Sequence, residues 1–337
     1  MTSSSSIVVV GAGVLGLCTA FELHRRGRSV LVVDPGQVNA SAAAAGMIAP
    51  AMEAAIDGAT PDQAGLFRAG RDMWPEFAQA AGIALFRRPA EWRGDAAADM
   101  AARMRALGFD ARQDGDRLIT DEDYQVEPAQ ALAAMKAALE TRIVTGRVGS
   151  VARDGDGWRV NTSDGAVEAR AVVLATGADA AVDSLPEAAH RLIATIQPIR
   201  GQIGVASRAL APHVVRGPGA YVAPMGPGAV VGATMEPGRR DTAPDAAAGE
   251  RLLQAAWRVL NRTPGTLEVE WRAGVRGASS DGLPLAGAAP GGPGLFMALA
   301  PRRNGWLLGP LIGGVVADAI EGRAASPHAH ALDPGRF

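Results

Sequence analysis

Two adjacent arginines, Arg302 and Arg303, stand between two apolar runs of the sequence. Residues 295–299 (LFMAL) are typical of a buried strand, and residues 306–320 are typical of a buried helix. Arginine is almost never buried unless it is paired, so we expect an anion at the junction of these elements. The start of the helix also directs its N–H groups and the positive end of its dipole toward the same place. The stretch therefore predicts a site for a negatively charged group at the mouth of an apolar core.

A glycine-rich stretch near the N-terminus has the spacing that holds a dinucleotide. Residues 11–16 (GAGVLG) follow a β-branched strand at 7–10 and open a helix, and a second strand at 30–33 ends in Asp34. This complete strand–helix–strand context makes a weak glycine pattern specific. The N-terminus of the helix offers unpaired N–H groups to phosphates.

Each residue of this motif has its own predicted role. Gly11 allows a tight turn, Gly13 lets the backbone approach a pyrophosphate, and Gly16 lets the helix pack closely on the strands. Asp34 would accept hydrogen bonds from ribose hydroxyls, which argues against a cofactor with a 2′-phosphate.

Three separated segments favour FAD over NAD as the dinucleotide. The parallel strand–helix units common in NAD dehydrogenases do not continue after Asp34. Small, uncharged residues at 39–52 instead predict a helix packed tightly against a large flat cofactor, although a plain alanine-rich core helix has the same composition. Far along the chain, a buried strand at 171–175 leads into Thr176-Gly177 and returns to the nucleotide site.

The remaining elements predict an α/β protein with two sheet-containing parts. A FAD-binding Rossmann-like (βαβ) domain is expected to carry an inserted mixed-sheet α+β substrate domain. The predicted FAD-binding domain is discontinuous and comprises residues 1–60, 125–195 and 277–337; the substrate-binding domain comprises residues 61–124 and 196–276. Helices are expected at 62–81, 95–108, 128–140 and 244–260, a three-stranded meander at 147–176, strands within 196–234 and at 267–276, and a hairpin at 226–232.

Composition excludes several classes of protein. The 337 residues are 48% hydrophobic and 20% charged, and the net charge of −2 gives no indication of a nucleic acid or a membrane surface as partner. No apolar stretch reaches the roughly 20 residues of a membrane-spanning helix, and the N-terminus lacks the basic region of a signal peptide, so the cytoplasm is the expected compartment.

Cys18 is the only cysteine and the histidines show no metal spacing, so we expect neither a disulfide nor a metal site. Lys136, the only lysine, is expected on an exposed helix face, unsuited to Schiff-base chemistry.

Over nearly its whole length the chain resembles the D-amino-acid oxidase superfamily of FAD-dependent oxidoreductases, and within it the glycine oxidases. The likeness rests on motifs that occur in the family's order: GAGVLGLCTAFEL…VVD, ASAAAAGMIAP, LATGA, QPIRGQI, YVAPMGPGAVVGATMEPG, AGVRGASSDGLPLAG and RNGWLLGPLIGGVVAD.

The chain departs from the family pattern on the side expected to bind substrate. The usual G-H-[YF]-R-N-G is A-P-R-R-N-G at residues 300–305, and Trp306 replaces an aliphatic residue. Met225 replaces a common arginine, and the stretch between about Met52 and Glu127 is shorter than in the glycine oxidases.

The resemblance implies a set of residues that bind a non-covalent FAD, since no cysteine stands where related sarcosine oxidases attach their flavin. The implied set is Gly11, Gly13, Val14, Leu15, Gly16, Asp34, Ser41, Ala45, Gly46, Met47, Val148, Thr176, Gly177, Asn304, Gly305, Trp306 and Leu307.

The resemblance also implies that Tyr221, Arg276 and Arg303 bind the carboxylate of a substrate. A guanidinium holds a carboxylate through two parallel hydrogen bonds, which fixes orientation as well as charge. Each residue has an ordinary structural alternative: a strand-end ion pair for Arg276, an internal ion pair for Arg303, and a half-buried sheet position for Tyr221. Arg302 is expected to point to solvent or to a carboxylate of the protein.

The expected activity is oxidative deamination of a small amino acid: glycine, sarcosine or a small D-amino acid. Hydride transfer from the α-carbon to flavin N5 gives an imino acid, which water converts to an oxo acid and ammonia, and O2 is reduced to H2O2. No catalytic acid or base is assigned. One alternative is a dehydrogenase that passes electrons to a quinone or another carrier; a second is a non-catalytic flavin-binding subunit, against which the carboxylate-binding residues argue. The exact substrate and the oligomeric state, including a homo-oligomer, stay open.

Overall fold

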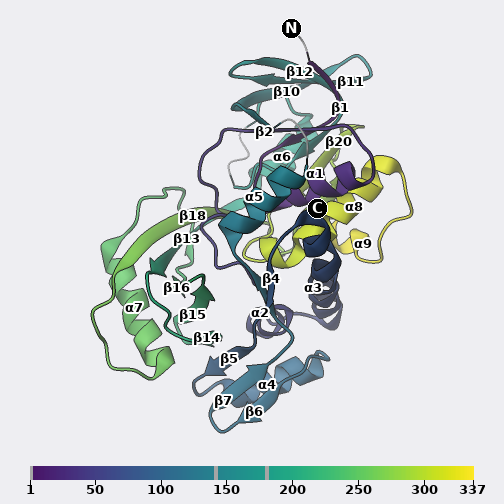
Figure 1. Ribbon diagram of the computed structural model, residues 1–337. Helices are drawn as coiled ribbons and strands as arrows, with labels where there is room; N and C mark the ends of the chain where they lie inside the picture. The colour runs from purple at the N-terminus through teal and green to yellow at the C-terminus, as the bar shows by residue number, and fades with distance from the viewer. Residues whose placement is uncertain (1–2, 140–142, 179–181) are drawn as a thin grey trace.

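A computed structural model describes residues 3–139, 143–178 and 182–337. The chain forms two large sheets and a small one that lies between them (Figure 1). Among the described residues, no helix combines the length and the hydropathy needed to cross a bilayer.

The first sheet is parallel at its centre and carries the glycine motif at one edge. Its middle strand β1 (Ser3–Val10) pairs in parallel with β2 (Val30–Asp34) on one side and with β12 (Gly165–Leu174) on the other. Val10 is in register with both Val33 and Leu174, so the carboxyl ends of the three strands meet at one edge, where open α/β sheets bind their ligands. The other strands of this eight-stranded sheet are β9 (Ile143–Thr145), β10 (Val148–Asp154), β11 (Gly157–Thr162), β19 (Leu285–Ala288) and β20 (Leu295–Leu299).

Helices α1 (Val14–Arg25) and α8 (Gly305–Glu321) pack against each other beside this sheet. Their backbones approach closely because glycine faces the contact: a Cβ atom on Gly313 of α8 would lie 2.8 Å from the carbonyl oxygen of Cys18 on α1. Helix α3 (Pro61–Ala81) begins with a capping box between Thr60 and Gln63 and packs on α8. The remaining helices are α2 (Pro50–Asp57), α5 (Pro128–Ala138), α6 (Glu187–Ala194), α9 (Ala329–Leu332) and α4 (Ala97–Ala106), of which α4 packs on strands β6 (Arg112–Asp114) and β7 (Arg117–Thr120) of the second sheet.

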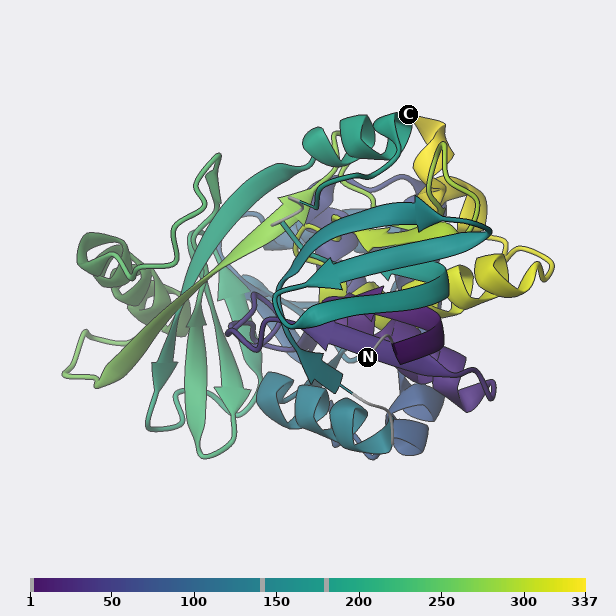
Figure 2. The same ribbon diagram turned by 90° about the horizontal axis from the view of Figure 1, so that it is seen from above.

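The second sheet is mixed, and one of its faces is covered by α7 (Ala246–Leu260), which lies on the outer side of the molecule in Figure 1. Alternation along the strands buries Val222 and Val231 against Leu252 and Trp257 of α7. Figure 2 shows the long strands β13 and β18 running from this sheet toward the first one. The strands of this nine-stranded sheet are β5 (Ala90–Arg93), β6 (Arg112–Asp114), β7 (Arg117–Thr120), β13 (Gln197–Ala206), β14 (Val214–Gly217), β15 (Ala220–Met225), β16 (Gly228–Gly232), β17 (Glu236–Pro237) and β18 (Val269–Ala278).

The predicted α/β class, with a parallel sheet and a mixed second sheet, is confirmed, and most predicted elements lie within a few residues of their expected bounds. The predicted domain boundaries stay a prediction. Helix α3, which lies in the predicted substrate-binding domain, packs on α8, which lies in the predicted FAD-binding domain. A third sheet joins β3 (Met47–Ile48), β8 (Tyr124–Val126) and β4 (Leu85–Arg87).

The helix predicted at 39–52 is wrong. The chain instead forms turns at 40–44, then β3, and becomes helical only at Pro50. Gly46 adopts φ = +66°, and a Cβ atom there would lie 3.0 Å from the carbonyl carbon of Val126, so the chain passes directly against β8 and turns. Alanine content alone indicated a helix, but tertiary packing decided against it.

We expect Gly313→Ala to destabilise the protein by about 1–3 kcal/mol, because the added methyl group would force α1 and α8 apart. Gly314→Ala is the matched control, since its Cβ would meet only the end of the Met73 side chain at 3.7 Å. Alanine is the better helix former, so this neighbour should be neutral or slightly stabilising. Thermal unfolding followed by circular dichroism checks both; equal midpoints for the two variants would contradict the close-packing argument.

Candidate functional site

A cavity of about 460 Å³ lies at the carboxyl edge of the first sheet. Strand-end residues Val10 and Val33 line it together with Thr176, and Gly274 of β18 closes it from the second sheet. A smaller cavity of about 110 Å³ adjoins it, since both are lined by Gly13, Ser41 and Gly177.

The glycine motif has the geometry that its sequence predicts. Gly11 adopts φ = +109°, and a Cβ there would lie 2.9 Å from the carbonyl carbon of Ala175. A Cβ on Gly16 would lie 3.1 Å from that of Ala175 and would also clash with the backbone of Gly11. A Cβ on Gly13 would meet only Oγ of Ser41, at 3.3 Å. The cavity side of Gly13 is therefore open to a ligand.

The carboxylate of Asp34 is fixed at the wall of the larger cavity. Its Oδ2 accepts a hydrogen bond from the amide of Ala12 at 2.6 Å, and its Oδ1 accepts one from Gly36 at 2.8 Å. A glycine cradle, a helix N-terminus and an oriented carboxylate in one elongated cavity fit a dinucleotide such as FAD.

Eleven of the residues expected to bind FAD line one or both cavities: Gly11, Gly13, Val14, Leu15, Asp34, Ser41, Val148, Thr176, Gly177, Gly305 and Trp306. The other six, Gly16, Ala45, Gly46, Met47, Asn304 and Leu307, do not belong to the lining, and their role toward FAD stays a prediction. Some of them have structural contacts: the carbonyl of Ala45 accepts from Gln125, and the sulfur of Met47 accepts from Arg216.

Two glycines make the face of the second sheet flat enough to carry Tyr221 and Arg276. Gly232 is the cross-strand partner of Tyr221, and a Cβ there would lie 2.8 Å from Cε1 of the ring. A Cβ on Gly201 would lie 2.5 Å from Cζ of Arg276. Any larger residue would push the phenol or the guanidinium off the sheet, so the strands position both groups by leaving out side chains.

Arg276 is a partly buried cation without a carboxylate partner among the residues that the structure describes. Its Nη1 lies 3.5 Å from the carbonyl oxygen of Thr234 and 3.5 Å from the sulfur of Met235. Burial lowers the pKa of Arg276, and burial raises the pKa of Tyr221 although nearby Arg276 opposes that rise. Arg276 lines the smaller cavity and is therefore available to an anionic ligand.

Arg303 lies in the same cavity but is already paired within the protein. Its Nε donates to Glu53, and its Nη2 lies 2.8 Å from Oδ1 of Asp57. Arg302 donates to the same Oδ1 at 2.8 Å. Helix α2 thus supplies the anions expected at this junction. Arg302 was expected to point to solvent or to a carboxylate of the protein, and it pairs with the carboxylate of Asp57. The substrate contact of Arg303 stays a prediction.

Glu53 joins Arg303 to the second sheet. Its Oε1 accepts a hydrogen bond from Nη1 of Arg216 at 2.7 Å. Burial alone would raise the pKa of Glu53, but Arg303 and Arg216 outweigh it and lower this pKa to about 2. Glu53 and Arg216 were missed by sequence reasoning; the only signal is that Glu53 is the first charged residue after a long uncharged stretch.

Asp123 is a buried acid near this pair that sequence reasoning also missed. Its Oδ1 has no hydrogen-bond partner among the described residues. Burial raises the pKa of Asp123 to about 8, although the charge of Arg216 opposes the rise. The carboxyl group is therefore mostly neutral at neutral pH.

Residues 6–319 match the family model described as DAO, FAD dependent oxidoreductase. The chain belongs to this family. The cavity at the glycine motif and the α/β fold are those of a FAD-dependent oxidoreductase, and the resemblance drawn from the sequence motifs is confirmed.

Individual relatives include glycine oxidases. The glycine oxidase of Geobacillus kaustophilus (strain HTA426) is 30% identical to this chain. The alignment has 368 positions, gaps included, and covers 95% of this chain and 94% of that protein. The crystal structure of a glycine oxidase from Geobacillus kaustophilus superimposes with a TM-score of 0.86 at 26% identity, with 100% of both chains covered.

A second kind of relative is longer than this chain. The tRNA 5-methylaminomethyl-2-thiouridine biosynthesis bifunctional protein MnmC of Caulobacter sp. (strain K31) is 32% identical over 98% of this chain but only 57% of its own length. The chain therefore spans little more than half of that bifunctional protein.

We expect Asp123→Asn to flatten the decline of stability with rising pH. The folded-state pKa of Asp123 is about 8 against an ordinary value of 3.8, so its stabilisation is complete below the ordinary value and is lost as the pH rises toward 8. Asparagine mimics the neutral acid and does not ionise. From about pH 5 to about pH 8, the thermal midpoint of Asp123→Asn should rise steadily relative to that of the wild type, because only the wild type loses this contribution. Parallel curves would show that Asp123 is ionised in the folded protein.

Proposed function

We propose that this protein oxidises small amino acids with a non-covalently bound FAD. The observation that carries the proposal is Arg276, a guanidinium without a carboxylate partner among the described residues. Arg276 lines the cavity that adjoins the glycine cradle and lies near Tyr221, which itself is outside the lining. A guanidinium at the edge of a dinucleotide cavity matches an α-carboxylate in charge and in geometry.

Arg276 and Tyr221 orient the substrate. Two N–H groups of Arg276 bind the two carboxylate oxygens, and the hydroxyl of Tyr221 donates a third hydrogen bond. Both groups lie on rigid strands, β18 and β15, so the α-carbon is held in one orientation. Fixing the reacting carbon in this way contributes much of the rate of a reaction that needs no catalytic acid or base.

FAD, when bound, supplies the hydride acceptor and passes the two electrons to O2, which becomes H2O2. Gly13, Ser41 and the start of α8 line the smaller cavity and would hold the flavin end of the cofactor. Cys18, the only cysteine, is buried between α1 and α8 next to Met135, away from both cavity linings, which supports non-covalent binding. The imino acid that leaves the site is hydrolysed to an oxo acid and ammonia.

Trp306 supports a small side chain on the substrate. The indole Nε1 donates to the carbonyl of Ser41 at 3.1 Å, and the ring packs against Trp74 with 6.1 Å between centroids. The indole is therefore fixed, and it lines the smaller cavity beside Arg276. A fixed bulky ring reduces the volume left for the substrate. The remaining space favours a small substrate such as glycine, sarcosine or a small D-amino acid.

We expect Arg276→Ala to bind FAD normally and to lower kcat/KM for the amino acid by roughly 30-fold or more, since one partner of a charge pair is removed. Arg272→Ala is the control on the same strand, because Arg272 is exposed and paired with Glu270. Arg276→Lys should recover only part of the loss, because an ammonium lacks the planar fork. Steady-state kinetics with flavin absorbance check this; a wild-type kcat/KM in Arg276→Ala would refute the substrate contact.

We expect anaerobic mixing with glycine, sarcosine or D-alanine to bleach the flavin absorbance and oxygen to restore it. Stopped-flow absorbance measures the two halves separately. Bleaching only by a bulky amino acid would refute the size argument based on Trp306. A reduced flavin that persists for minutes in air-saturated buffer would identify the protein as a dehydrogenase that uses a quinone or another carrier. No bleaching by any amino acid, with FAD bound, would leave the non-catalytic alternative.

A further inference from the structure

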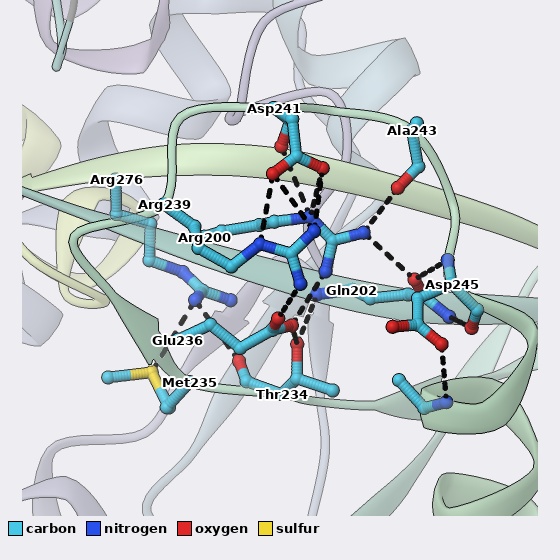
Figure 3. A network of polar contacts seen from close by, with 11 residues as sticks. Arg200, Gln202, Thr234, Met235, Glu236, Arg239, Asp241, Ala243, Asp245 and Arg276 are labelled. Carbon is cyan, nitrogen blue, oxygen red and sulfur yellow. Dashed lines mark hydrogen bonds and ion pairs between the residues drawn. The ribbon is translucent and has the colours of Figure 1, made fainter.

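Residues 234–245 connect the second sheet to α7 and pass from the Arg276 side of the site to the larger cavity. Arg200 of β13 holds this segment from below, and Figure 3 shows its guanidinium at the centre of the contacts. The side chain of Arg200 is fully buried; its Nη1 donates to Glu236 at 2.6 Å and its Nε to the carbonyl oxygen of Asp241 at 3.1 Å, while Nη2 reaches the carbonyl of Ala243. Three points along the segment are thus fixed to one buried side chain.

Two consecutive arginines of this segment have different partners. Arg239 pairs with Glu236 at 2.5 Å and with Asp241 at 2.9 Å, so its charge is compensated within the segment. Arg240 makes neither contact. Its Nη1 donates to the carbonyl oxygen of Ala178 at 2.8 Å, at the residue that follows Thr176-Gly177 of the nucleotide site.

Arg240 and Thr242 both line the larger cavity, as Gly11 and Gly13 of the glycine motif do. Among the described residues, no carboxylate lies within ion-pair distance of Arg240. Asp34 is the only acidic residue among the described residues of the lining, and two backbone amides hold it. The diphosphate of a dinucleotide brings two negative charges into this cavity, and a guanidinium without a carboxylate partner is a suitable group to meet them.

We propose that Arg240, assisted by the hydroxyl of Thr242, binds the adenosine diphosphate part of FAD from the second sheet's side of the cavity. The glycine motif then holds the cofactor on one side and the 234–245 segment holds it on the other. Arg200 is the positioning residue, because it fixes the segment at Glu236, Asp241 and Ala243 without lining the cavity.

The same segment also contacts the substrate side of the site. Its first residues, Thr234 and Met235, lie at Arg276 (Figure 3), so a cofactor bound by Arg240 also immobilises the segment that contacts Arg276. The inference rests on the FAD cofactor and not on the amino-acid substrate. A failure of Arg240 to bind FAD is therefore distinguishable from a failure of amino-acid oxidation.

Titration of the apoprotein with FAD, followed by quenching of flavin fluorescence, tests the proposal. Arg240→Ala should raise the Kd for FAD about 10-fold or more, because a charge-assisted contact is lost. The Kd for ADP, measured by calorimetry, should rise by a similar factor, and the dependence of FAD binding on salt should become shallower. Arg239→Ala is the matched control and should leave both Kd values within about 2-fold, as expected for an exposed surface pair.

Arg240 is exposed, so its variants should fold, and circular dichroism of each apoprotein verifies this. Arg240→Lys should restore part of the affinity because it retains the charge, whereas Arg240→Gln should not. An unchanged Kd for FAD in Arg240→Ala would overturn the proposal. An equal loss in Arg239→Ala would overturn it as well, because it would assign the effect to the segment's shape instead of a contact with the cofactor.

Discussion

The site depends on one electrostatic contrast, between a guanidinium that has a protein counter-ion and one that does not. Arg303 meets Glu53 and Asp57 of α2, and Arg216 shares Glu53. Arg276 lines the same cavity as Arg303 and, among the described residues, meets only a carbonyl oxygen and a sulfur. A buried charge without a partner is costly, so this one cation is the place where a ligand's carboxylate gains most.

The acids around the cavity sharpen this contrast. Arg216, Arg302 and Arg303 pair with the carboxylates of Glu53 and Asp57, Arg276 adds a fourth guanidinium, and burial keeps Asp123 largely neutral. An ionised Asp123 would compensate part of the positive charge near Arg216 and weaken the attraction for an anion. A neutral buried acid therefore preserves the positive potential of the cavity.

Sequence reasoning predicted the structural features that are determined by residues adjacent along the chain. The nucleotide motif is a strand, three glycines and a helix in continuous order, so Gly11, Gly13 and Asp34 could be assigned from the order of residues alone. Tyr221 and Arg276 came from resemblance to a family. The pairing of Arg303 with Glu53 joins residues 250 positions apart, and only the tertiary fold brings α2 to the turn that precedes α8. Arg240 carried no local signal either, since nothing in Arg239-Arg240 indicates which arginine turns to the cavity. The helix expected at 39–52 failed for the same reason: contact with β8 turned the chain at Gly46.

The two sheets cooperate because β13 and β18 cross between them. One end of this strand pair presents Gly201 and Arg276 to the substrate side, and Gly274 and Val275 of β18 also line the nucleotide cavity. A shift of β18 by one residue would turn Arg276 to the opposite face and move the wall of the nucleotide cavity at the same time. Ten residue pairs along β13 and β18 oppose such a shift, and Gly201 admits the guanidinium only in the observed register. Substrate orientation and cofactor binding are therefore set by the same strand pairing, and a change that loosens this pairing should damage both.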